Sequence, residues 1–468
     1  MSTKIRWTPS SGAQQRGARW DGWTLTVNTA YRGSLLRHVL HQSDSRAVVV
    51  AADFLERIHR DAGELETLEK VLVLGEMSDP PSFSIPVLAF DVLLSQQAPL
   101  PSIDMSPRDS MAILYSSGTT GVSKGILLCH NYFWFAGNQS LTLRGVTADD
   151  RIYTCLPLFH GNAQMLSTMP ALLAGATLVL DTQFSASTFW ERLRASRATQ
   201  FNYIGGMIPI LMKQPPSAAD RQHAVKMATG AAAPRDQLLA FEQRFGVRLL
   251  EGYGQTENCV ALVNPVGAPR VGSIGLPICG YDADVVNDDD EPVPPGTIGE
   301  LVVRPQHPFI MMDGYYKMPQ ATLEMCRNLW MHTGDLVTRD EDGYYYFVDR
   351  KKDAMRRRGE NISAFEVEAA VNSHPAVLES AAIAVPSEVG EDEVMVCVVL
   401  KPGQTLAALD LIKHCEELIA YFAVPRYVDF CTELPKTPTF RVEKYRLREQ
   451  GVTPTTWDRE KAGYTLRR

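Results

Sequence analysis

The sequence lacks the features that mark several large classes of protein. Its eight cysteines include no C-x-x-C pair and no Cys/His cluster at zinc spacing, which argues against a zinc site or a disulfide framework and favours a reducing, cytoplasmic compartment. No long block of one charge occurs, and 46 Lys and Arg stand against 54 Asp and Glu, a net charge of −8. Nucleic acid and anionic membranes are therefore poor candidates as partners.

Long apolar segments are also missing. The longest, MPALLAGATLVL at residues 169–180, is too short to span a bilayer, and no apolar stretch follows the basic residues of the N-terminus. We therefore expect neither a signal peptide nor a membrane span. With 45% hydrophobic and 21% charged residues, the composition is that of a globular protein, and 468 residues exceed what one hydrophobic core usually supports. At least two domains are expected.

Hydrophobic patterns divide the chain into regions of different character. In the first half, β-branched runs such as 47–54 and 176–181 alternate with helical patterns, which predicts an α/β domain. From about residue 270, Gly-, Pro- and Asp-rich turns join short strand-like runs and predict an antiparallel β subdomain.

The last part of the chain reads as a small α+β domain. Its expected elements are a helix at 363–374, strands at 380–385 and 394–400, and a helix near 406–422. The sequence thus predicts three parts, which are a loose arm at 1–22, a large domain at 23–349 and a small domain at 350–468.

The most informative segment is AILYSSGTTGVSKGILLCHN at residues 112–131. An apolar strand runs into Ser, Thr and Gly residues with one lysine, Lys124, and a second strand follows. Hydroxyl and N–H groups on a glycine-permitted turn can hold phosphate oxygens, and the lysine adds a positive charge. The order differs from the Walker pattern, and no G-x-G-x-x-G follows a strand, so neither a P-loop ATPase nor a dinucleotide fold is supported.

With eight further motifs in the same order, the sequence resembles the adenylate-forming superfamily of acyl-CoA synthetases, luciferases and nonribosomal peptide adenylation domains. The motifs are LPLFHGNAQ (156–164), GAAAP (230–234), GYGQTEN (252–258), GSIGLP (272–277), GEL (299–301), TGD (333–335), DRKKDAMRRRGENISAFEVE (349–368) and LPKTPTFRVEKYRLRE (434–449). An ordered set is far more specific than any single motif. Within this superfamily, the segments VNTAYRG (27–33) and TWDREKAGY (456–464) most resemble the corresponding segments of crotonobetaine/carnitine-CoA ligases.

The resemblance implies an ATP-dependent carboxylic acid–CoA ligase with a large α/β domain and a mobile small domain. A carboxylate attacks the α-phosphate of ATP to form an acyl-adenylate and pyrophosphate, and the thiol of coenzyme A, a co-substrate, then displaces AMP. Mg²⁺ accompanies the nucleotide.

The resemblance also assigns the triphosphate site. Lys124 and the loop before it would hold the β- and γ-phosphates. The loop residues are Ser116, Ser117, Gly118, Thr119, Thr120 and Gly121. Glu257 would bind Mg²⁺, which prefers a few hard oxygens plus phosphate, and Thr256 would contact the α-phosphate. Without the neighbouring residues of the motif, Glu257 would be interpreted as an ordinary surface carboxylate.

A second group of residues would hold the adenosine. These are Tyr253 and Gly254, the loop residues Gly230, Ala231 and Ala232 and, at the ribose, Asp335 and Arg350. Tyr253 would stack on the adenine, and the carboxylate of Asp335 would accept hydrogen bonds from both ribose hydroxyls.

The acyl and CoA sites are implied in the same way. His160 would form a gate or wall beside the acyl carbonyl. The acyl pocket would be lined by small and apolar residues from 160–166, 203–208, near 230 and 255–260, which suits a modest, partly apolar acid. Lys352 matches the hinge between the domains, and Gly359 and Glu360 would approach the pantetheine. We expect the basic run at 351–358 to form a solvated face that also contacts the phosphates of CoA.

The chain departs from the family pattern near its C-terminus. The family reads P-K-T-x-x-G-K there, whereas PKTPTFR places Phe440 and Arg441 at the last two positions. Arginine keeps the positive charge of the family lysine but not its compact geometry. We expect Arg441 to take its catalytic role at the α-phosphate, with Lys444 as the alternative.

The front of the chain is short in comparison with the family. Relatives carry several strands and helices before the segment that resembles VNTAYRG, which starts here at Val27. We therefore expect an incomplete first α/β unit whose sheet exposes strand edges and an apolar face.

Two other functions stay open at this point. One is an adenylating enzyme with a non-CoA acceptor, or one that activates a small oxyacid such as nitrite. The other is a degenerate nucleotide-binding relative without turnover. The identity of the acid and the oligomeric state, including a homodimer, are also open.

Overall fold

The computed structural model describes most of the chain. The described residues are 4–5, 24–29, 31, 33–62, 65–77, 81–95, 104–115, 123–351, 355–357, 360–387, 392–436 and 442–466. The chain divides into two compact units, one of Met1–Gly118, Val122–Asp282 and Pro305–Cys326, the other of Thr119–Gly121, Ala283–Arg304 and Arg327–Arg468. Each unit is described by itself.

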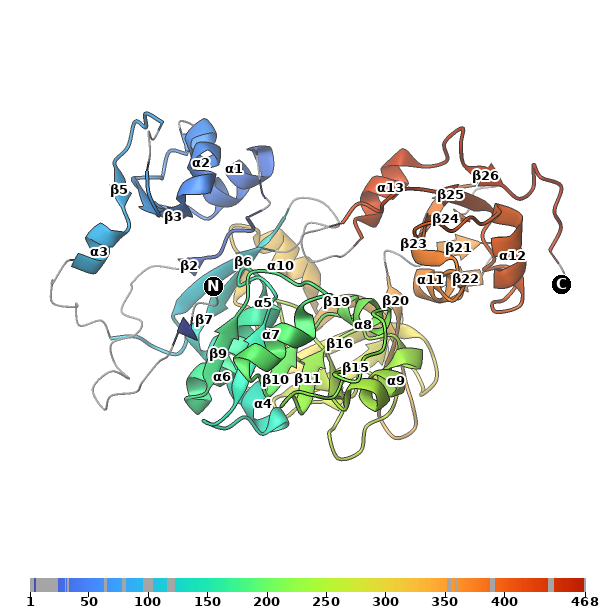
Figure 1. Ribbon diagram of the computed structural model, residues 1–468, viewed down its shortest axis with the longest axis horizontal. Coiled ribbons are helices and arrows are strands. Elements are labelled where there is room, and N and C mark those ends of the chain that lie inside the picture. Colours follow the sequence, from blue (N-terminus) through green and yellow to red (C-terminus); the bar gives the residue numbers. More distant parts are fainter. Residues whose placement is uncertain are drawn as a thin grey trace. The chain divides into compact units, whose positions relative to one another are not determined.

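The first unit contains an eight-stranded sheet of order β1-β9-β8-β10-β11-β12-β13-β14. Figure 1 labels β9, β10 and β11 of this sheet. Its five middle strands are parallel: β9 (Thr177–Leu180), β8 (Arg151–Thr154), β10 (Gln200–Asn202), β11 (Met227–Gly230) and β12 (Arg248–Tyr253). Short antiparallel strands complete it: β1 (Lys4–Ile5), β13 (Leu262–Val263) and β14 (Leu276–Pro277). The carboxyl ends of the parallel strands share one edge, where α/β sheets usually bind ligands.

Helices follow the parallel strands and bury their apolar faces. They are α6 (Met169–Ala174), α7 (Phe189–Ser196), α8 (Met207–Met212) and α9 (Arg235–Phe245). Trp190 of α7 stacks on Phe245 of α9, with ring centroids 4.5 Å apart, and Phe201 of β10 is completely buried beneath them. Large aromatic side chains contribute most to such a core because each buries a large apolar area. The predicted α/β alternation is confirmed.

A second sheet holds the strands on either side of the predicted phosphate loop. Its order is β17-β7-β6-β2, with β2 (Thr24–Leu25), β6 (Ser110–Tyr115), β7 (Gly125–Cys129) and β17 (Gly314–Tyr315). Residues 116–122, between β6 and β7, lie outside the described residues. The helical segments near this sheet in the sequence are α4 (His130–Arg144), α5 (Gly161–Ala163), a π-helical turn (Gln164–Thr168) and α10 (Pro319–Met325).

A small parallel sheet lies near the start of the chain. It comprises β3 (Ala47–Ala51), β4 (Lys70–Leu74) and β5 (Val87–Ala89), and its neighbours in sequence are α1 (Gly33–Gln42), a 3-10 turn (Ala52–Phe54), α2 (Leu55–Ala62) and α3 (Asp91–Ser95). Residues of α1 and α2 cover one face of the sheet with apolar side chains.

Among the described residues, the opposite face of this small sheet carries several exposed apolar side chains. Val49 and Leu88 occupy one register row through Leu72, and both are exposed, at 56% and 41%. Leu74, on the same face of β4, is exposed at 53%. Leu72, which lies between Val49 and Leu88, is buried at 7% exposure, so this face exposes its apolar side chains only in part.

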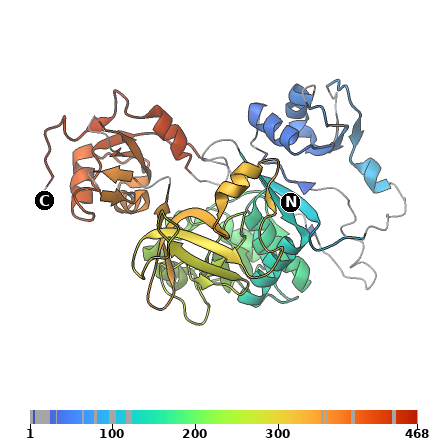
Figure 2. The same cartoon turned by 180° about the vertical axis from the view of Figure 1, so that it is seen from behind.

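The second unit begins with the predicted antiparallel subdomain, whose yellow and orange strands are clearest from behind (Figure 2). The strands β15 (Tyr281–Val286), β16 (Gly299–Pro305), β19 (Trp330–Arg339) and β18 (Cys326–Arg327) follow in that order, and β20 (Tyr345–Arg350) pairs with β19. Antiparallel pairing of β19 with β16 and β20 places the motifs GEL, TGD and DRK side by side.

The C-terminal part is the predicted α+β fold. A four-stranded sheet of order β23 (Val377–Pro386), β24 (Asp392–Leu400), β25 (Tyr427–Phe430) and β26 (Trp457–Asp458) accompanies the hairpin β21 (Met355–Arg357) and β22 (Glu360–Ile362). The helices are α11 (Ala364–Asn372), α12 (Ala408–Glu416) and α13 (Lys444–Gln450). Ser363 caps α11 by accepting a hydrogen bond from the backbone N–H of Glu366, the S-x-x-E capping pattern. The predicted fold class is confirmed.

None of the helices in the described part of the chain combines the length and the apolar character that a membrane span requires.

Because Val49 and Leu88 are exposed apolar side chains, we predict that the protein self-associates and that charged residues at these positions reduce the self-association. In the double variant Val49→Lys/Leu88→Lys we expect lower binding of the dye ANS and less light scattering on concentration, because apolar surface is replaced by charge. The free energy of unfolding should change by no more than about 1 kcal/mol, since both side chains are exposed. Ser84→Lys adds charge without removing apolar surface and is the control. Unchanged dye binding in the double variant would contradict this prediction.

Candidate active site

Lys124 stands immediately before β7 and is held at a defined place. Its Nζ lies 4.7 Å from the centroid of the Tyr315 ring. The preceding residue, Ser123, is buried, and its carbonyl oxygen lies 3.0 Å from Nε2 of His38. A hydrogen bond also joins the side chains of Ser123 and Tyr31. Neither His38 nor Tyr31 was among the predicted site residues, although Tyr31 belongs to the motif VNTAYRG.

Other predicted residues lie outside the described part of the chain. They are Ser116, Ser117, Gly118, Thr119, Thr120 and Gly121 of the phosphate loop, the hinge residue Lys352, Gly359 and Arg441. Of Glu360, only the backbone in β22 is described.

Thr256 and Glu257 lie in the loop after β12, whose backbone is fixed by contacts from distant elements. The hydroxyl of Tyr132 donates to the carbonyl oxygen of Thr256 at 2.7 Å, and the backbone N–H of Met312 donates to that of Glu257 at 2.9 Å. Tyr132 itself is completely buried in α4. The loop is therefore held in shape before any ligand binds.

Gly254 is required by the closeness of two backbone segments in this loop. A Cβ atom added at Gly254 would lie 1.6 Å from the carbonyl oxygen of Cys259, a distance that no side chain can occupy. Cys259 in turn adopts a positive φ of 56°. The preceding residue, Tyr253, is buried at the end of β12. Backbone packing therefore requires glycine at position 254 of the motif YGQTE, independently of any contact with a ligand.

The carboxylate of Glu257 accepts a hydrogen bond from the hydroxyl of Tyr315 at 2.9 Å. Burial, and then the charge of Glu257, raise the pKa of Tyr315 far above its ordinary value, so the tyrosine stays a neutral donor. Glu257 and Lys124 therefore both contact the side chain of Tyr315. Glu257 contacts its hydroxyl, and Lys124 lies over the face of its ring.

The chemistry of this carboxylate fits magnesium carried by a nucleotide. The described residues hold no group of three or more His, Cys, Asp or Glu side chains that could bind a metal ion. A lone carboxylate suits Mg²⁺, which keeps several waters and takes most other ligands from phosphates. It does not suit a resident transition metal, which needs several protein ligands.

The predicted adenine loop follows β11. A Cβ atom at Gly230 would lie 2.4 Å from the carbonyl oxygen of Tyr203, and Ala232 adopts a positive φ of 63°. Ala231 and Ala232 are exposed, so their backbone is accessible to a ligand. The loop is a tightly constrained turn at the carboxyl edge of the parallel sheet.

Glu251, which sequence analysis missed, supports this loop from below. It is 8% exposed in β12 and accepts hydrogen bonds on Oε1 from the hydroxyl of Tyr203 and from the backbone N–H of Ala233. Burial raises its pKa from 4.5 to about 7, against the lowering effect of the hydrogen bond from Tyr203. The only sequence signal is a carboxylate inside the strand RLLEGY.

His160 precedes α5 and lines a small cavity in the first unit. The other lining residues are Thr26, Asn28, Tyr31, Val39, Tyr115 and Phe159. The amide Nδ2 of Asn162 donates to the carbonyl oxygen of Tyr203 at 3.3 Å. The two segments predicted for the acyl pocket, 160–166 and 203–208, are therefore neighbours.

Asp335 and Arg350 form a pair within the second unit. They are register partners on β19 and β20, and Nε of Arg350 lies 3.0 Å from Oδ1 of Asp335. The side chain of Asp335 is 2% exposed. Gly334 precedes it with a positive φ of 70°, which glycine adopts without strain. The two predicted ribose residues are brought together, whereas their convergence with Lys124 and Glu257, which belong to the first unit, stays a prediction.

A buried acidic residue, Glu300, holds this turn. It accepts hydrogen bonds from the backbone N–H of Gly334 at 3.0 Å and from Nζ of Lys351 at 3.1 Å, and Nδ1 of His332 lies 3.3 Å from it. Burial alone would raise the pKa of Glu300, but the hydrogen bond from Lys351 and its charge outweigh this and lower it. Sequence analysis used Glu300 only as part of the motif GEL.

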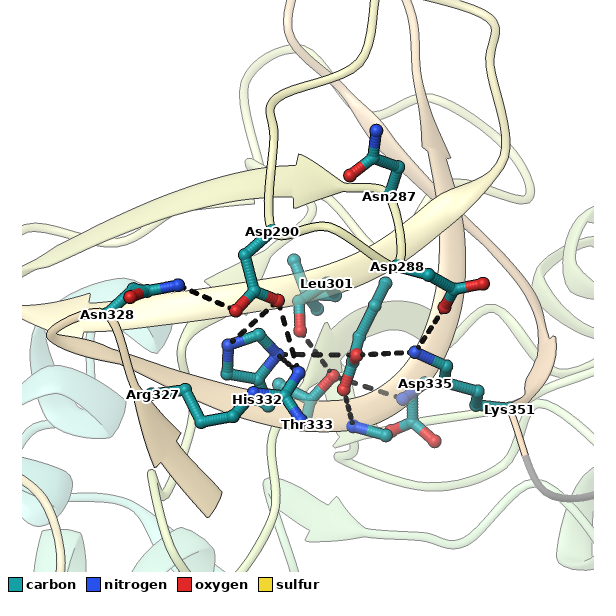
Figure 3. A network of polar contacts seen from close by, with 12 residues as sticks. Asn287, Asp288, Asp290, Leu301, Arg327, Asn328, His332, Thr333, Asp335 and Lys351 are labelled. Atoms are coloured by element: carbon teal, nitrogen blue, oxygen red, sulfur yellow. Dashed lines mark hydrogen bonds and ion pairs between the residues drawn. The ribbon is translucent and has the colours of Figure 1, made fainter. Parts of the chain in front are cut away.

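The network includes further charged and polar side chains, among them Asp288, Asp290, His332 and Lys351, which Figure 3 labels. Lys351 also reaches Oδ1 of the exposed Asp288 at 2.8 Å, and His332 lies between Glu300 and Asp290. Lys351 directly follows Arg350, so the network fixes β20 as well as the TGD turn.

Two parts of the predicted basic face have other roles. Lys351 is bound into the acidic network, and Arg357 is 3% exposed and forms a buried ion pair with Glu393 at 2.8 Å. For Arg357 the expectation of a solvated face is wrong, because its charge is paired inside the second unit.

Lys444, the alternative to Arg441, is also paired. Its Nζ lies 2.8 Å from Oε1 of Glu368, and both side chains are less than one fifth exposed. In this arrangement its charge compensates a partly buried carboxylate.

The raised pKa of Glu251 predicts a pH-dependent stability. The folded protein keeps a proton that the unfolded chain releases above pH 4.5, so stability falls as the pH rises from 4.5 to about 7. Glu251→Gln cannot ionise and can keep both hydrogen bonds on Oε1. It should therefore be more stable than the wild type at pH 8, by about 3 kcal/mol, and nearly equal at pH 4.5. Denaturant unfolding at both pH values checks this, and equal differences would contradict it.

The network at Glu300 predicts coupling between its charge and the ribose turn. Glu300→Gln can still accept from Gly334, but it places an amide against the ammonium of Lys351. We expect ATP to bind about tenfold more weakly, because a partly buried ion pair is lost. Asp288→Asn removes the exposed partner of Lys351 and should change ATP binding by less than about twofold. Calorimetric titration with ATP checks both variants, and equal effects would refute the special role of Glu300.

Comparison with known proteins agrees with these motifs. The sequence model of the AMP-binding enzyme family matches residues 18–316, and that of the AMP-binding enzyme C-terminal domain matches residues 366–441. A crotonobetaine/carnitine–CoA ligase of Salmonella paratyphi B is 35% identical over 351 residues, which cover 74% of this chain and 67% of the relative.

Solved structures show the same similarity. The anthranilate CoA ligase AuaEII in complex with anthranoyl-AMP gives a TM-score of 0.80 at 26% identity, covering 91% of this chain and 82% of that one. ATP-bound MatB from Rhodopseudomonas palustris gives 0.79 at 26% identity, covering 92% and 84%. Because the family model matches more than half of the chain and the curated relative is covered over two thirds of its length, the chain belongs to the AMP-binding enzyme family.

Proposed function

We propose that this protein is an ATP-dependent carboxylic acid–CoA ligase that forms an acyl-adenylate and releases pyrophosphate and AMP. The main support for the proposal is that Lys124 and Glu257 both contact the side chain of Tyr315. A cation for phosphate and a carboxylate for magnesium are thus held within one small region of the first unit, as nucleotide triphosphate chemistry requires.

The triphosphate part of the mechanism follows from these groups. Lys124 and the loop 116–121 bind the β- and γ-phosphates and stabilise the charge that develops on the leaving pyrophosphate. Thr256 hydrogen-bonds the α-phosphate. When bound at Glu257, Mg²⁺ supplies Lewis-acid polarisation of the phosphate oxygens.

The adenosine part uses the carboxyl edge of the parallel sheet and the second unit. Tyr253, Gly254 and the backbone of Gly230 to Ala232 receive the adenine, and Asp335 with Arg350 receives the ribose. Support comes from the exposed backbone of the adenine loop and from the ion pair of Asp335 with Arg350. Fixing the nucleotide in this way converts the attack of the carboxylate into an effectively intramolecular step.

The cation at the α-phosphate is proposed to be Arg441. A carboxylate that attacks a phosphate needs positive charge between the two anions. Lys444 is the poorer choice, because it is paired with the partly buried Glu368. Arginine at this place keeps the charge but presents a planar guanidinium.

The acyl substrate is proposed to be a small, partly apolar carboxylic acid. Support comes from the mixed lining of the cavity beside His160, where Phe159 and Val39 face Asn28 and Thr26. The names of the similar proteins, for crotonobetaine or carnitine and for anthranilate, are also those of small acids. His160 would form the wall beside the acyl carbonyl.

The second half-reaction involves the small domain. We propose a loose arm at 1–22, a large domain at 23–349 and a small domain at 350–468, with Lys352 at the hinge and Gly359 and Glu360 near the pantetheine of CoA. The match of residues 366–441 to the C-terminal domain of AMP-binding enzymes supports this division. Movement of the small domain between the two half-reactions would bring CoA to the acyl-adenylate.

The test measures pyrophosphate and AMP release across short, branched, aromatic and betaine-like carboxylates, with and without CoA. We expect pyrophosphate release that depends on one class of acid, and AMP release that CoA accelerates. Acid-dependent pyrophosphate release without a CoA effect would indicate another acceptor, and nitrite in the panel covers an oxyacid. ATP binding without any acid-dependent release would overturn the proposal in favour of a non-catalytic nucleotide binder.

Variants in the same assay connect the function to its residues. Lys124→Met should lower ATP–pyrophosphate exchange by about 10²- to 10³-fold, as expected for a preorganised charge at the reacting phosphate. Arg441→Ala should do the same, whereas Arg441→Lys should retain exchange. Undiminished exchange in Arg441→Ala would remove this residue from the mechanism.

A further inference from the structure

Tyr315 is a buried residue that no motif in the sequence analysis assigned to the site. It lies on β17 and pairs with Ile126 of β7, the strand that begins directly after Lys124. Its backbone N–H donates to Oγ1 of Thr322 at 2.9 Å, and the next N–H, that of Tyr316, donates to the carbonyl oxygen of Gly125 at 2.7 Å. The backbone of Tyr315 is therefore fixed relative to β7.

The hydroxyl of Tyr315 has two neighbours of unequal strength. Oη lies 2.9 Å from Oε1 of Glu257 and 3.1 Å from Sδ of Met325. A hydroxyl has one hydrogen to donate, and a carboxylate is a much better acceptor than a thioether. The hydrogen therefore goes to Glu257, while Met325 packs against the oxygen.

The face of the same ring receives the ammonium of Lys124 at 4.7 Å. A cation over an aromatic face is attracted by the ring quadrupole, and the attraction grows where water is excluded. Lys124 is half-buried, and Tyr315 is only 7% exposed. The ring thus gives the flexible lysine a preferred resting position beside the loop that precedes it.

We propose that Tyr315 is a positioning residue for the magnesium–triphosphate site, orienting the carboxylate of Glu257 through its hydroxyl and the ammonium of Lys124 through its ring. This inference rests on the proposed function, because it takes Glu257 as the metal carboxylate and Lys124 as the phosphate lysine. Both side chains carry rotamer freedom that binding would otherwise have to remove, and holding them beforehand favours binding.

The two halves of the proposal can be separated by substitution. Tyr315→Phe removes the hydroxyl and keeps the ring, whereas Tyr315→Leu removes both. Tyr316→Phe is the matched control, because the hydroxyl of Tyr316 also donates to a carboxylate, Oδ2 of Asp44, at 2.8 Å. Circular dichroism melting shows whether each variant is folded.

The readout is equilibrium binding of α,β-methylene-ATP, followed by calorimetry over a range of Mg²⁺ concentrations and in its absence. In Tyr315→Phe we expect the Mg²⁺ concentration for half-maximal enhancement of binding to rise about three- to tenfold, with metal-free binding unchanged within about twofold. In Tyr315→Leu we expect metal-free binding to weaken as well, by about three- to tenfold, because Lys124 loses its ring. Tyr316→Phe should change neither quantity.

A double-mutant cycle keeps the test decisive if a single variant is poorly folded. In a Glu257→Gln background, Tyr315→Phe should have no further effect on the Mg²⁺ requirement, because the carboxylate that the hydroxyl orients is already gone. A wild-type Mg²⁺ requirement in Tyr315→Phe, with a raised one in Glu257→Gln, would overturn the inference and leave the proposed function standing. If Glu257→Gln and Lys124→Met both bind the analogue as the wild type does, the proposed function fails instead.

Discussion

The structure depends on very close backbone contacts at the carboxyl edge of the parallel sheet. A Cβ atom at Gly254 would lie 1.6 Å from the carbonyl oxygen of Cys259, and one at Gly205 would lie 1.8 Å from that of Ala232. These contacts leave room only for hydrogen, so each loop has one allowed shape. The groups proposed to bind the adenine and the α-phosphate are displayed on these loops. Rigidity there means that little ordering remains to be done when a nucleotide binds.

Tyrosine hydroxyls hold the same region from several directions. Tyr132 donates to a backbone carbonyl of the loop after β12, and Tyr203 and Tyr315 donate to carboxylates within residues 251–258. The hydroxyl of Tyr281 lies within hydrogen-bond distance of the carbonyl oxygens of Asn258 and Ile310. A buried tyrosine packs its ring into the core and still supplies one directed hydrogen bond. In the second unit a charged residue has the corresponding role. Glu300 accepts hydrogen bonds both from the TGD turn and from Lys351, which directly follows the adjacent strand. Both devices place a ligand-binding side chain by fixing the backbone next to it.

The local pattern of the sequence was sufficient for the fold class and for proposing which residues carry chemistry. Strand and helix periods are properties of neighbouring residues, so the α/β alternation, the antiparallel subdomain and helix α11 could be predicted. Lys124, Glu257 and Asp335 were identified because each stands in a short motif whose order matches a known family. The exposure of Val49 and Leu88 on the small sheet could not be predicted residue by residue, since Leu72 between them is buried.

What the sequence by itself determined is therefore which elements form and which side chains supply charge and hydrogen bonds. Only the tertiary structure decided what holds those side chains, because the partners lie far apart in the chain. Tyr315 is 58 residues from Glu257, and His38 is 85 residues from Ser123. A single tyrosine or histidine has no periodicity, so nothing local distinguishes it from others of its kind. Its role arises from the pairing of distant strands, which brings its polar atom within hydrogen-bond distance of the site.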